Sequence, residues 1–144
     1  MNIACIGTGF VGVVTAAVFA KLGNKIVGLD IDEAKIAKLR EGIVPFYEPD
    51  LSELLLSTQK EGDLTFTTDY KTAIEDADIV MIMVGTPTSA DGSADLKYVF
   101  AAAEEIAQHM THYTVVVNKS TVPVGTARKV EAIIRKANPN ADFD

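Results

Sequence analysis

The sequence predicts an α/β fold, in which a doubly wound parallel sheet is covered by helices on both faces. Short apolar runs alternate with helical patterns along the 144 residues, an order typical of parallel strands joined by crossover helices. The runs are nearly continuous in valine, isoleucine and methionine, as in DIVMIMV at 78–84, which indicates strands buried on both faces. A glycine-rich turn, GTGFVG at 7–12, leads from the first run into the first helix. These features predict a Rossmann-like sheet in a single domain.

The elements follow in order along the chain. Strands are expected at 2–6, 25–29, 64–68, 78–84 and 113–118. Helices are expected at 10–22, from about 32 to a stop at Gly42, directly after Asp50, at roughly 95–110 and at about 125–137. The first helix has apolar residues at helical spacing, namely Val11, Val14, Val18 and Leu22. Asp50 is expected to cap the third helix, which would bury Leu51, Leu54 and Leu55. The closing residues ADFD indicate the approach to a sixth strand, so the fold is expected to be truncated before its last strand.

Charge and hydropathy limit the classes of partner. The net charge of −7 disfavours nucleic acid and anionic membrane surfaces, and no apolar stretch is long enough to span a bilayer. Residues 1–20 lack a basic leader and contain three glycines, which argues against a signal peptide and for a cytoplasmic location. No nucleic-acid or membrane partner is expected.

Cysteine and histidine chemistry is not expected to contribute. Cys5 is the single cysteine and lies inside an apolar strand, so we interpret it as a small buried side chain rather than a nucleophile. His109 and His112 fall in a helix-to-strand connection, on the edge of the sheet opposite the decorated loops. No cluster has metal-ligand spacing, and no metal is expected.

The turn at 7–12 indicates a dinucleotide site. Gly7 and Gly9 allow a tight turn and a close backbone approach to a pyrophosphate, and Gly12 lets the next helix pack closely on the strand. Asp30 follows Gly12 by 18 residues, at the end of the second strand, where a carboxylate accepts hydrogen bonds from the adenine-ribose hydroxyls. No arginine follows it, so NAD is favoured over NADP. Lys35, one turn into the next helix, is either a second cofactor contact or a solvated surface lysine.

Two further strand ends carry unusual loops. VGTPT at 84–88 supplies Gly85 for a close approach, the Thr86 hydroxyl and the stiffening Pro87. KSTVPVGT at 119–126 places three hydroxyl residues around a proline and a glycine. Ligands of open α/β sheets bind outside the carboxyl ends of the strands, so these loops, the glycine turn and Asp30 are expected to share one rim.

These motifs together resemble a known family. MNIACIGTGFVG, GLDID, PFYEPDL, VGTPTSADGSADL and KSTVPVGT, in this order, are similar to the N-terminal NAD-binding domain of the UDP-glucose/GDP-mannose dehydrogenases, over residues 1 to about 137. Within that family the motifs are most similar to those of the members that oxidise UDP-glucose. The resemblance implies an NAD-dependent, four-electron oxidation of a sugar-nucleotide alcohol to the carboxylate, with a cysteine thioester between two hydride transfers.

The resemblance also implies site residues. Val11, Asp30, Lys35, Thr86 and Thr121 match positions that contact NAD, and Thr121 is expected to act catalytically by helping to position a water. The full set of expected cofactor-binding residues is Gly7, Thr8, Gly9, Phe10, Val11, Gly12, Asp30, Lys35, Gly85, Thr86, Pro87 and Thr121.

The family's remaining machinery has no match in this sequence. Its nucleophilic cysteine, catalytic lysine, asparagine and glutamate, and its sugar-nucleotide and dimerisation regions, fall beyond residue 144. Residues 1–144 are therefore expected to be the cofactor domain of a homodimeric enzyme, inactive as a fragment. A GDP-mannose or UDP-N-acetylhexosamine dehydrogenase, a two-electron hydroxyacid dehydrogenase and a non-enzymatic nucleotide-sensing module remain alternatives.

Overall fold

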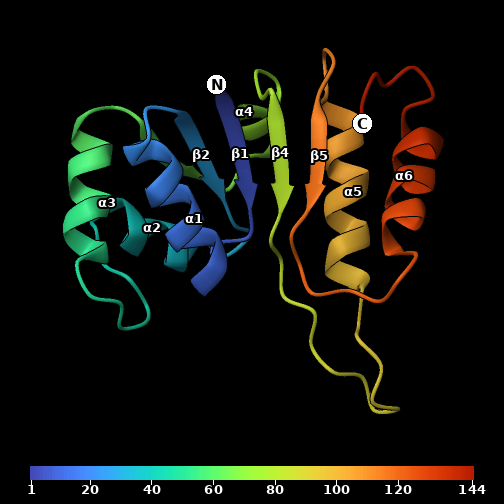
Figure 1. Ribbon diagram of the computed structural model, residues 1–144, viewed down its shortest axis with the longest axis horizontal. Coiled ribbons are helices and arrows are strands. Elements are labelled where there is room, and N and C mark those ends of the chain that lie inside the picture. The colour runs from blue at the N-terminus through green and yellow to red at the C-terminus, as the bar shows by residue number, and fades with distance from the viewer.

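The computed structural model describes residues 1–144 as an α/β domain (Figure 1). Its strands are β1 (Asn2–Ile6), β2 (Lys25–Leu29), β3 (Leu64–Thr67), β4 (Ile79–Ile82) and β5 (Val115–Asn118). Its helices are α1 (Phe10–Lys21), α2 (Glu33–Arg40), α3 (Leu51–Lys60), α4 (Tyr70–Ile74), α5 (Lys97–His109) and α6 (Thr126–Ala137). None of these helices combines the length and the apolar character that crossing a membrane would require.

The strands form one parallel sheet in the order β3-β2-β1-β4-β5. The chain winds outward from β1 through β2 to β3 and then returns to the other side of β1 as β4, so the winding direction reverses between β1 and β4. The labelled arrows of β1, β2, β4 and β5 in Figure 1 point to the same edge, where the loops that follow these strands come together. The doubly wound parallel sheet predicted from the sequence is confirmed.

Two apolar cores cover the two faces of the sheet, and β1 contributes to both. Ile3 and Cys5 point into the core formed with α1, α2 and α3, whereas Ala4 and Ile6 point into the core formed with α4, α5 and α6. All four side chains are at most 3% exposed. This alternation explains why the strand is a continuous apolar run, since neither of its faces meets water.

Helix α1 packs on the sheet through its smallest residues. Its buried positions are Gly12, Val13, Ala16, Ala17 and Ala20. Of the larger residues at helical spacing, Val11, Val18 and Leu22 are exposed, and Val14 alone packs partly buried against the core. Small side chains let the helix axis approach the sheet, and four of the five buried positions are accordingly glycine or alanine, with Val13 as the larger exception.

Two local expectations need correction. Asp50 directly precedes α3, but it has a left-handed backbone (φ 62°) and its side chain makes no capping hydrogen bond, so the predicted cap is wrong. Helix α4 was not expected at all, because five residues are too short to display a helical period. Its one local signal is Asp69, which accepts a hydrogen bond from the Thr72 backbone N–H (2.9 Å) as an N-cap.

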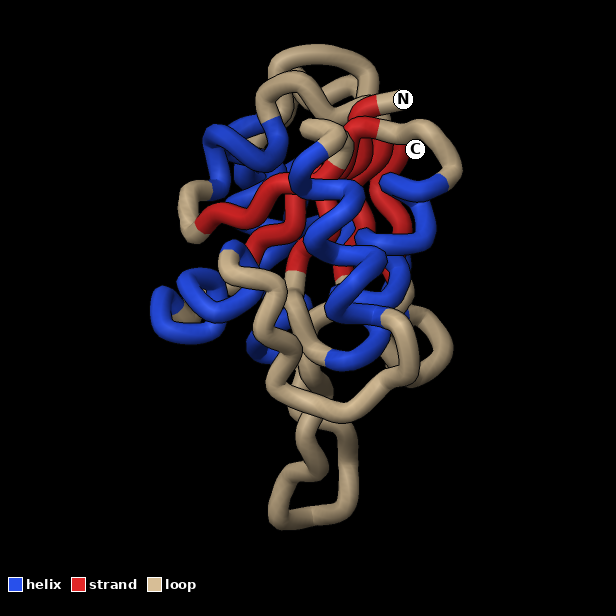
Figure 2. Tube along the Cα trace, turned by 90° about the vertical axis from the view of Figure 1, so that its left-hand side faces the viewer, coloured by secondary structure: helices blue, strands red, loops and turns tan.

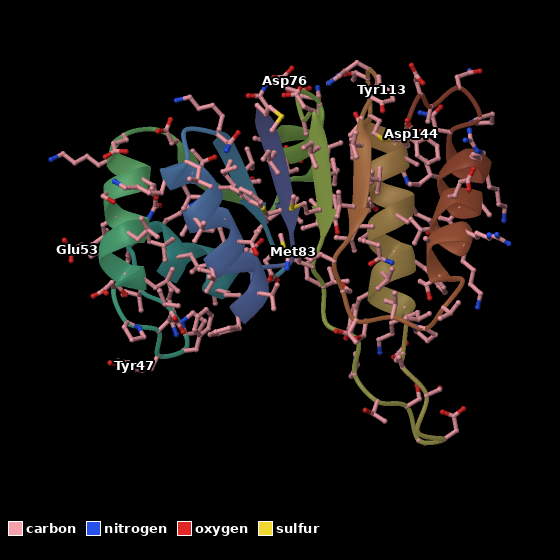
Figure 3. All side chains as sticks on the ribbon, in the orientation of Figure 1. Tyr47, Glu53, Asp76, Met83, Tyr113 and Asp144 are labelled. Carbon is pink, nitrogen blue, oxygen red and sulfur yellow. The ribbon has the colours of Figure 1, made fainter.

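The last residues lie along the outer edge of β5. The Thr114 N–H donates to the Asp142 carbonyl (3.1 Å) and the Val116 N–H donates to the Asp144 carbonyl (2.8 Å). Figure 3 places Tyr113 and Asp144 next to each other at this end of the sheet, where the tyrosine hydroxyl donates to the carboxylate (2.9 Å). Residues 142–144 therefore pair in parallel with the start of β5, as expected for the approach to a further strand.

A long loop between β4 and α5 extends away from the sheet. Thr88 and Ala94 form an isolated antiparallel bridge in it, and Asp91 accepts hydrogen bonds from the backbone and hydroxyl of Ser93 at its tip. Figure 2 shows this loop as the longest projection from the domain, at the edge where the strands end. The loop thus begins at the rim and continues well beyond it.

Substituting Gly12 tests the close packing of α1. A Cβ atom at Gly12 would overlap the backbone carbonyl oxygen of Gly7, which cannot move aside as a flexible side chain could. We expect Gly12→Ala to lower the free energy of unfolding by about 3 kcal/mol or more, measured by urea denaturation. Gly9→Ala is the matched control, because a Cβ there meets nothing within 4 Å. Equal stability of the two variants would contradict this packing.

Candidate functional site

A cavity of about 680 Å³ opens at the edge of the sheet where the strands end. The segments after β1, β2, β4 and β5 line it, together with residues of α4 and α5. Figure 3 shows Met83 next to the ends of β1 and β4, at the point where the winding direction reverses. The cavity therefore occupies the switch point at which doubly wound sheets bind their ligands.

The turn between β1 and α1 forms the centre of the cavity. Gly7 has φ 101°, donates its N–H to the Leu29 carbonyl (2.7 Å) and would clash through a Cβ with the Met83 carbonyl oxygen, 2.7 Å away. Gly9 lines the cavity as the N-cap residue of α1, and a Cβ there would project into open space. The first N–H groups of α1 have no partner within the helix, so the turn presents donors and the positive end of a helix dipole to an anion.

Asp30 is held by four hydrogen bonds at the end of β2. Its Oδ2 accepts from the Thr8 backbone N–H (2.9 Å), the Thr8 hydroxyl (2.8 Å) and the Lys35 ammonium (2.8 Å). Its Oδ1 accepts only from the Asp32 N–H (3.1 Å). The carboxylate is nearly enclosed, with 11% of its side chain exposed, yet Asp30 lines the cavity.

These contacts determine the protonation state of Asp30. Burial raises the pKa of the carboxyl, but the hydrogen bonds from Lys35, Thr8 and Asp32 outweigh it, so the pKa lies below its ordinary value. Asp30 is therefore ionised near neutral pH. It offers an acceptor to a ligand and is a poor base for taking up a proton.

The loops after β4 and β5 are tied together by hydroxyl groups. The Ser120 hydroxyl donates to the Val84 carbonyl (2.8 Å), and the Thr86 hydroxyl donates to the Thr121 carbonyl (3.0 Å). The Thr126 hydroxyl donates to the Pro123 carbonyl (2.7 Å) at the start of α6. Three of the hydroxyl groups in these loops therefore have structural partners.

Thr121 differs from these residues. It is exposed, it lines the cavity, and its hydroxyl makes no hydrogen bond within the chain. Lys119, two residues earlier, also lines the cavity and forms no ion pair. A hydroxyl and an ammonium group at the end of β5 are thus free to meet a ligand.

The structure brings most of the expected site residues to this cavity. Those that line it are Gly7, Gly9, Phe10, Val11, Asp30, Lys35, Gly85, Thr86 and Thr121. Thr8, Gly12 and Pro87 do not line it. Thr8 is buried against Asp30, and Gly12 is buried against the backbone of Gly7.

Sequence reasoning missed two tyrosines that line the cavity, Tyr70 on α4 and Tyr98 on α5. Burial, followed by the charges of Glu105 and Asp30, raises the pKa of Tyr70, so its hydroxyl stays protonated and can donate. The signal that could have found Tyr70 is its position after the third strand, since the other strand ends carry site residues.

The remaining candidates lie elsewhere. His109 pairs with Glu105 (3.7 Å) at the end of α5, and His112 precedes β5, so both histidines lie at the opposite edge of the sheet, as predicted. Cys5 is fully buried, and desolvation raises the pKa of its thiol to about 12. The structure contains no group of three or more histidine, cysteine or acidic side chains that could hold a metal ion.

Comparison with known proteins identifies the family to which the chain belongs. The model of the UDP-glucose/GDP-mannose dehydrogenase family, NAD binding domain, matches residues 1–144. The chain belongs to this family. The cofactor of the domain is accordingly NAD, as the glycine turn and Asp30 predicted.

Individual members of the family are similar over nearly the whole chain. The UDP-glucose 6-dehydrogenase TuaD of Bacillus subtilis is 52% identical over 137 residues, which are 95% of this chain and 30% of that protein. The structure of a UDP-glucose dehydrogenase from Pyrobaculum islandicum matches with a TM-score of 0.93 and 38% identity, covering 98% of this chain and 34% of the other. A GDP-mannose dehydrogenase from Pseudomonas aeruginosa matches with a TM-score of 0.95 and 34% identity, covering 100% of this chain and 35% of the other. The chain thus spans about a third of the length of these relatives.

The pH dependence of stability tests the Asp30 cluster. Because the pKa of Asp30 is lower in the folded state than in the unfolded state, its stabilisation is present above the unfolded pKa and is lost as the pH falls through the folded pKa. We expect Asp30→Asn to lower the free energy of unfolding by about 1–3 kcal/mol at neutral pH. The difference from the unchanged chain should shrink below the ordinary pKa of 3.8, as measured by urea denaturation at a series of pH values.

Asp76→Asn is the control for that series. Asp76 is exposed and its carboxylate accepts no hydrogen bond, so its substitution should leave the pH profile of stability unchanged. If the two variants gave the same profile, the Asp30 cluster would have no role in acid stability.

Proposed function

We propose that this chain is the NAD-binding N-terminal domain of a UDP-glucose 6-dehydrogenase, which oxidises UDP-glucose to UDP-glucuronate with two NAD per turnover. The main support is the 52% identity to such an enzyme over 95% of the chain. The cavity also supports it, because the glycine turn, the carboxylate and the free hydroxyl of separate motifs line one site. In this proposal the activity belongs to the full-length protein, and residues 1–144 form its cofactor domain.

The residues present fit NAD. Bound NAD supplies the hydride acceptor of the oxidation. The open space at Gly9 and the unpaired N–H groups of α1 suit its pyrophosphate, and Oδ1 of Asp30 suits the adenine-ribose hydroxyls. Gly85 and Thr86 after β4, with Thr121 after β5, fall toward the half of the sheet that holds the nicotinamide end in folds of this type.

Thr121 is the residue of this chain that we assign to the reaction itself. Its free hydroxyl lines the cavity and can hold a water or a substrate oxygen near the reacting centre. Cys5 does not form the thioester that the family resemblance implies, because it is buried and desolvation keeps its thiol protonated. We therefore assign the nucleophile, and the sugar-nucleotide site, to parts of the full-length enzyme outside residues 1–144.

The identity of the sugar nucleotide has a second candidate. The match to a GDP-mannose dehydrogenase over the whole chain favours GDP-mannose as the alternative, and a UDP-N-acetylhexosamine substrate is compatible with the same cofactor domain. The non-enzymatic alternative is a module that senses a nucleotide and catalyses no reaction. A cytoplasmic location and a homodimeric full-length protein stay predictions of the sequence.

Calorimetry tests the cofactor assignment. We expect the chain to bind NAD and Asp30→Ala to lose about 1–3 kcal/mol of binding free energy, because the ribose hydroxyls lose their charged acceptor. Asp91→Ala, at the tip of the projecting loop and outside the cavity, is the control and should bind like the unchanged chain. An unchanged affinity for NAD in Asp30→Ala would contradict the assignment of Asp30 to the cofactor.

Stoichiometry tests the reaction of the full-length enzyme. We expect two NADH for each UDP-glucose consumed, followed by absorbance, and no turnover by residues 1–144 alone, since no reactive cysteine lies at the cavity. One NADH per substrate would favour a two-electron dehydrogenase. NAD binding without turnover of any sugar nucleotide would favour the sensing module.

A further inference from the structure

Thr8 stands between two glycines of the turn, yet its side chain does not face the cavity. Gly7 and Gly9 line the cavity, whereas Thr8 is 1% exposed and is absent from the lining. Its backbone N–H and its hydroxyl both donate to the carboxylate of Asp30. The residue therefore acts on the end of β2 rather than on a ligand directly.

The donors to Asp30 are distributed unevenly between its two oxygens. Three donors reach Oδ2, at 2.8–2.9 Å, and two of them come from Thr8. A single backbone N–H reaches Oδ1, at 3.1 Å. A carboxylate has about four lone-pair positions, so Oδ2 is saturated and Oδ1 alone keeps capacity for a further donor.

We propose that Thr8 is a positioning residue that favours NAD over NADP. Its two hydrogen bonds hold Oδ2 of Asp30 in place, so that Oδ1 is the one acceptor offered to the adenine ribose. This proposal rests on the proposed function, since it assumes that Asp30 receives the ribose hydroxyls. It adds a residue that acts only through another residue and that makes no contact with the cofactor.

Orientation matters here because charge alone discriminates weakly. The Lys35 ammonium lies 2.8 Å from Oδ2 and offsets the negative charge that would repel the 2′-phosphate of NADP. Without the Thr8 hydrogen bonds the Asp30 carboxylate could rotate away from the ribose, and Lys35 could then pair with the 2′-phosphate instead. The Thr8 donors hold both the carboxylate and its lysine partner in the arrangement that offers Oδ1 to a ribose hydroxyl.

The shape of the site allows a clean test. The Thr8 Cγ2 methyl lies against β2 at Gly28, where an added Cβ would come within 3.6 Å of it. Thr8→Val keeps this methyl and the backbone N–H but removes the hydroxyl donor, whereas Thr8→Ser keeps the hydroxyl. The two variants therefore separate hydrogen bonding from packing.

Calorimetry with NAD and NADP on the whole chain is the first measurement. We expect Thr8→Val to bind NAD about tenfold more weakly, which corresponds to one hydrogen bond to a charged group, and NADP to lose less. Thr8→Ser should retain the affinity and the NAD preference of the unchanged chain. A Thr8→Val variant that keeps both overturns the proposal.

The carboxyl carbon of Asp30, followed by NMR through an acid titration, gives a readout that needs no ligand. The charged and titratable groups around Asp30 are Lys35 on α2, Asp32 before it and Tyr70 on α4, with Glu105 of α5 acting on Tyr70; all are the same in the variants. We expect the midpoint of the titration to move to higher pH in Thr8→Val and to stay in place in Thr8→Ser. An unmoved midpoint in Thr8→Val overturns the proposal. If Thr8→Val does not fold, as judged by circular dichroism, Thr8→Ala takes its place.

Asp30→Ala separates the role of Thr8 from the binding of NAD at Asp30. Loss of NAD affinity in Asp30→Ala together with full affinity in Thr8→Val removes the role of Thr8 and leaves the cofactor site intact. Full affinity for NAD in Asp30→Ala contradicts both the assignment of Asp30 to the cofactor and the positioning role of Thr8. Loss in Asp30→Ala and Thr8→Val, with recovery in Thr8→Ser, supports both.

Discussion

The close contact between the start of α1 and the end of β1 is the constraint on which the rest of the site depends. Gly12 rests directly on the carbonyl of Gly7, and Gly7 rests on the backbone at Met83. With no side chain in either gap, the N-terminus of α1 is held against the switch point of the sheet. The same turn carries Thr8 to the end of β2, where it meets Asp30, so backbone packing and the polar cluster are parts of one arrangement.

The parallel sheet extends this arrangement across the domain. Because every strand runs in the same direction, each one delivers its following loop to the same edge, and hydroxyl groups then join neighbouring loops. Ser120 and Thr86 link the segments after β4 and β5, which leaves Thr121 as the unengaged hydroxyl between them. The cluster of hydroxyl residues in KSTVPVGT therefore divides into groups that hold the loops together and one group that is available to a ligand.

The sequence contains enough information to predict the sheet, the five longer helices and the rim, because these depend on local patterns, whereas the five residues of α4 are too few to show one. Apolar runs, glycine turns and strand-end loops are all visible in short windows, and the strand and helix limits differ from expectation by only a few residues. Features that depend on distant contacts were missed: the exposure of the larger α1 residues and the place of Tyr70 both follow from how helices meet the sheet. The failed cap at Asp50 follows from its left-handed backbone, since a side chain that caps a helix normally extends from a β-region backbone.

The groups around the cavity are suited to binding and orientation more than to covalent chemistry. Asp30 is kept ionised by its donors, so it is a strong acceptor and a weak base. Cys5, the single thiol, is enclosed by the core formed with α1, α2 and α3 and stays protonated. At the end of β5, the Thr121 hydroxyl and the Lys119 ammonium have no partner within the chain and are free to meet a ligand. The lining of the cavity contains neither a cysteine nor a histidine, so the groups that the domain places there are ones that hold and orient a cofactor.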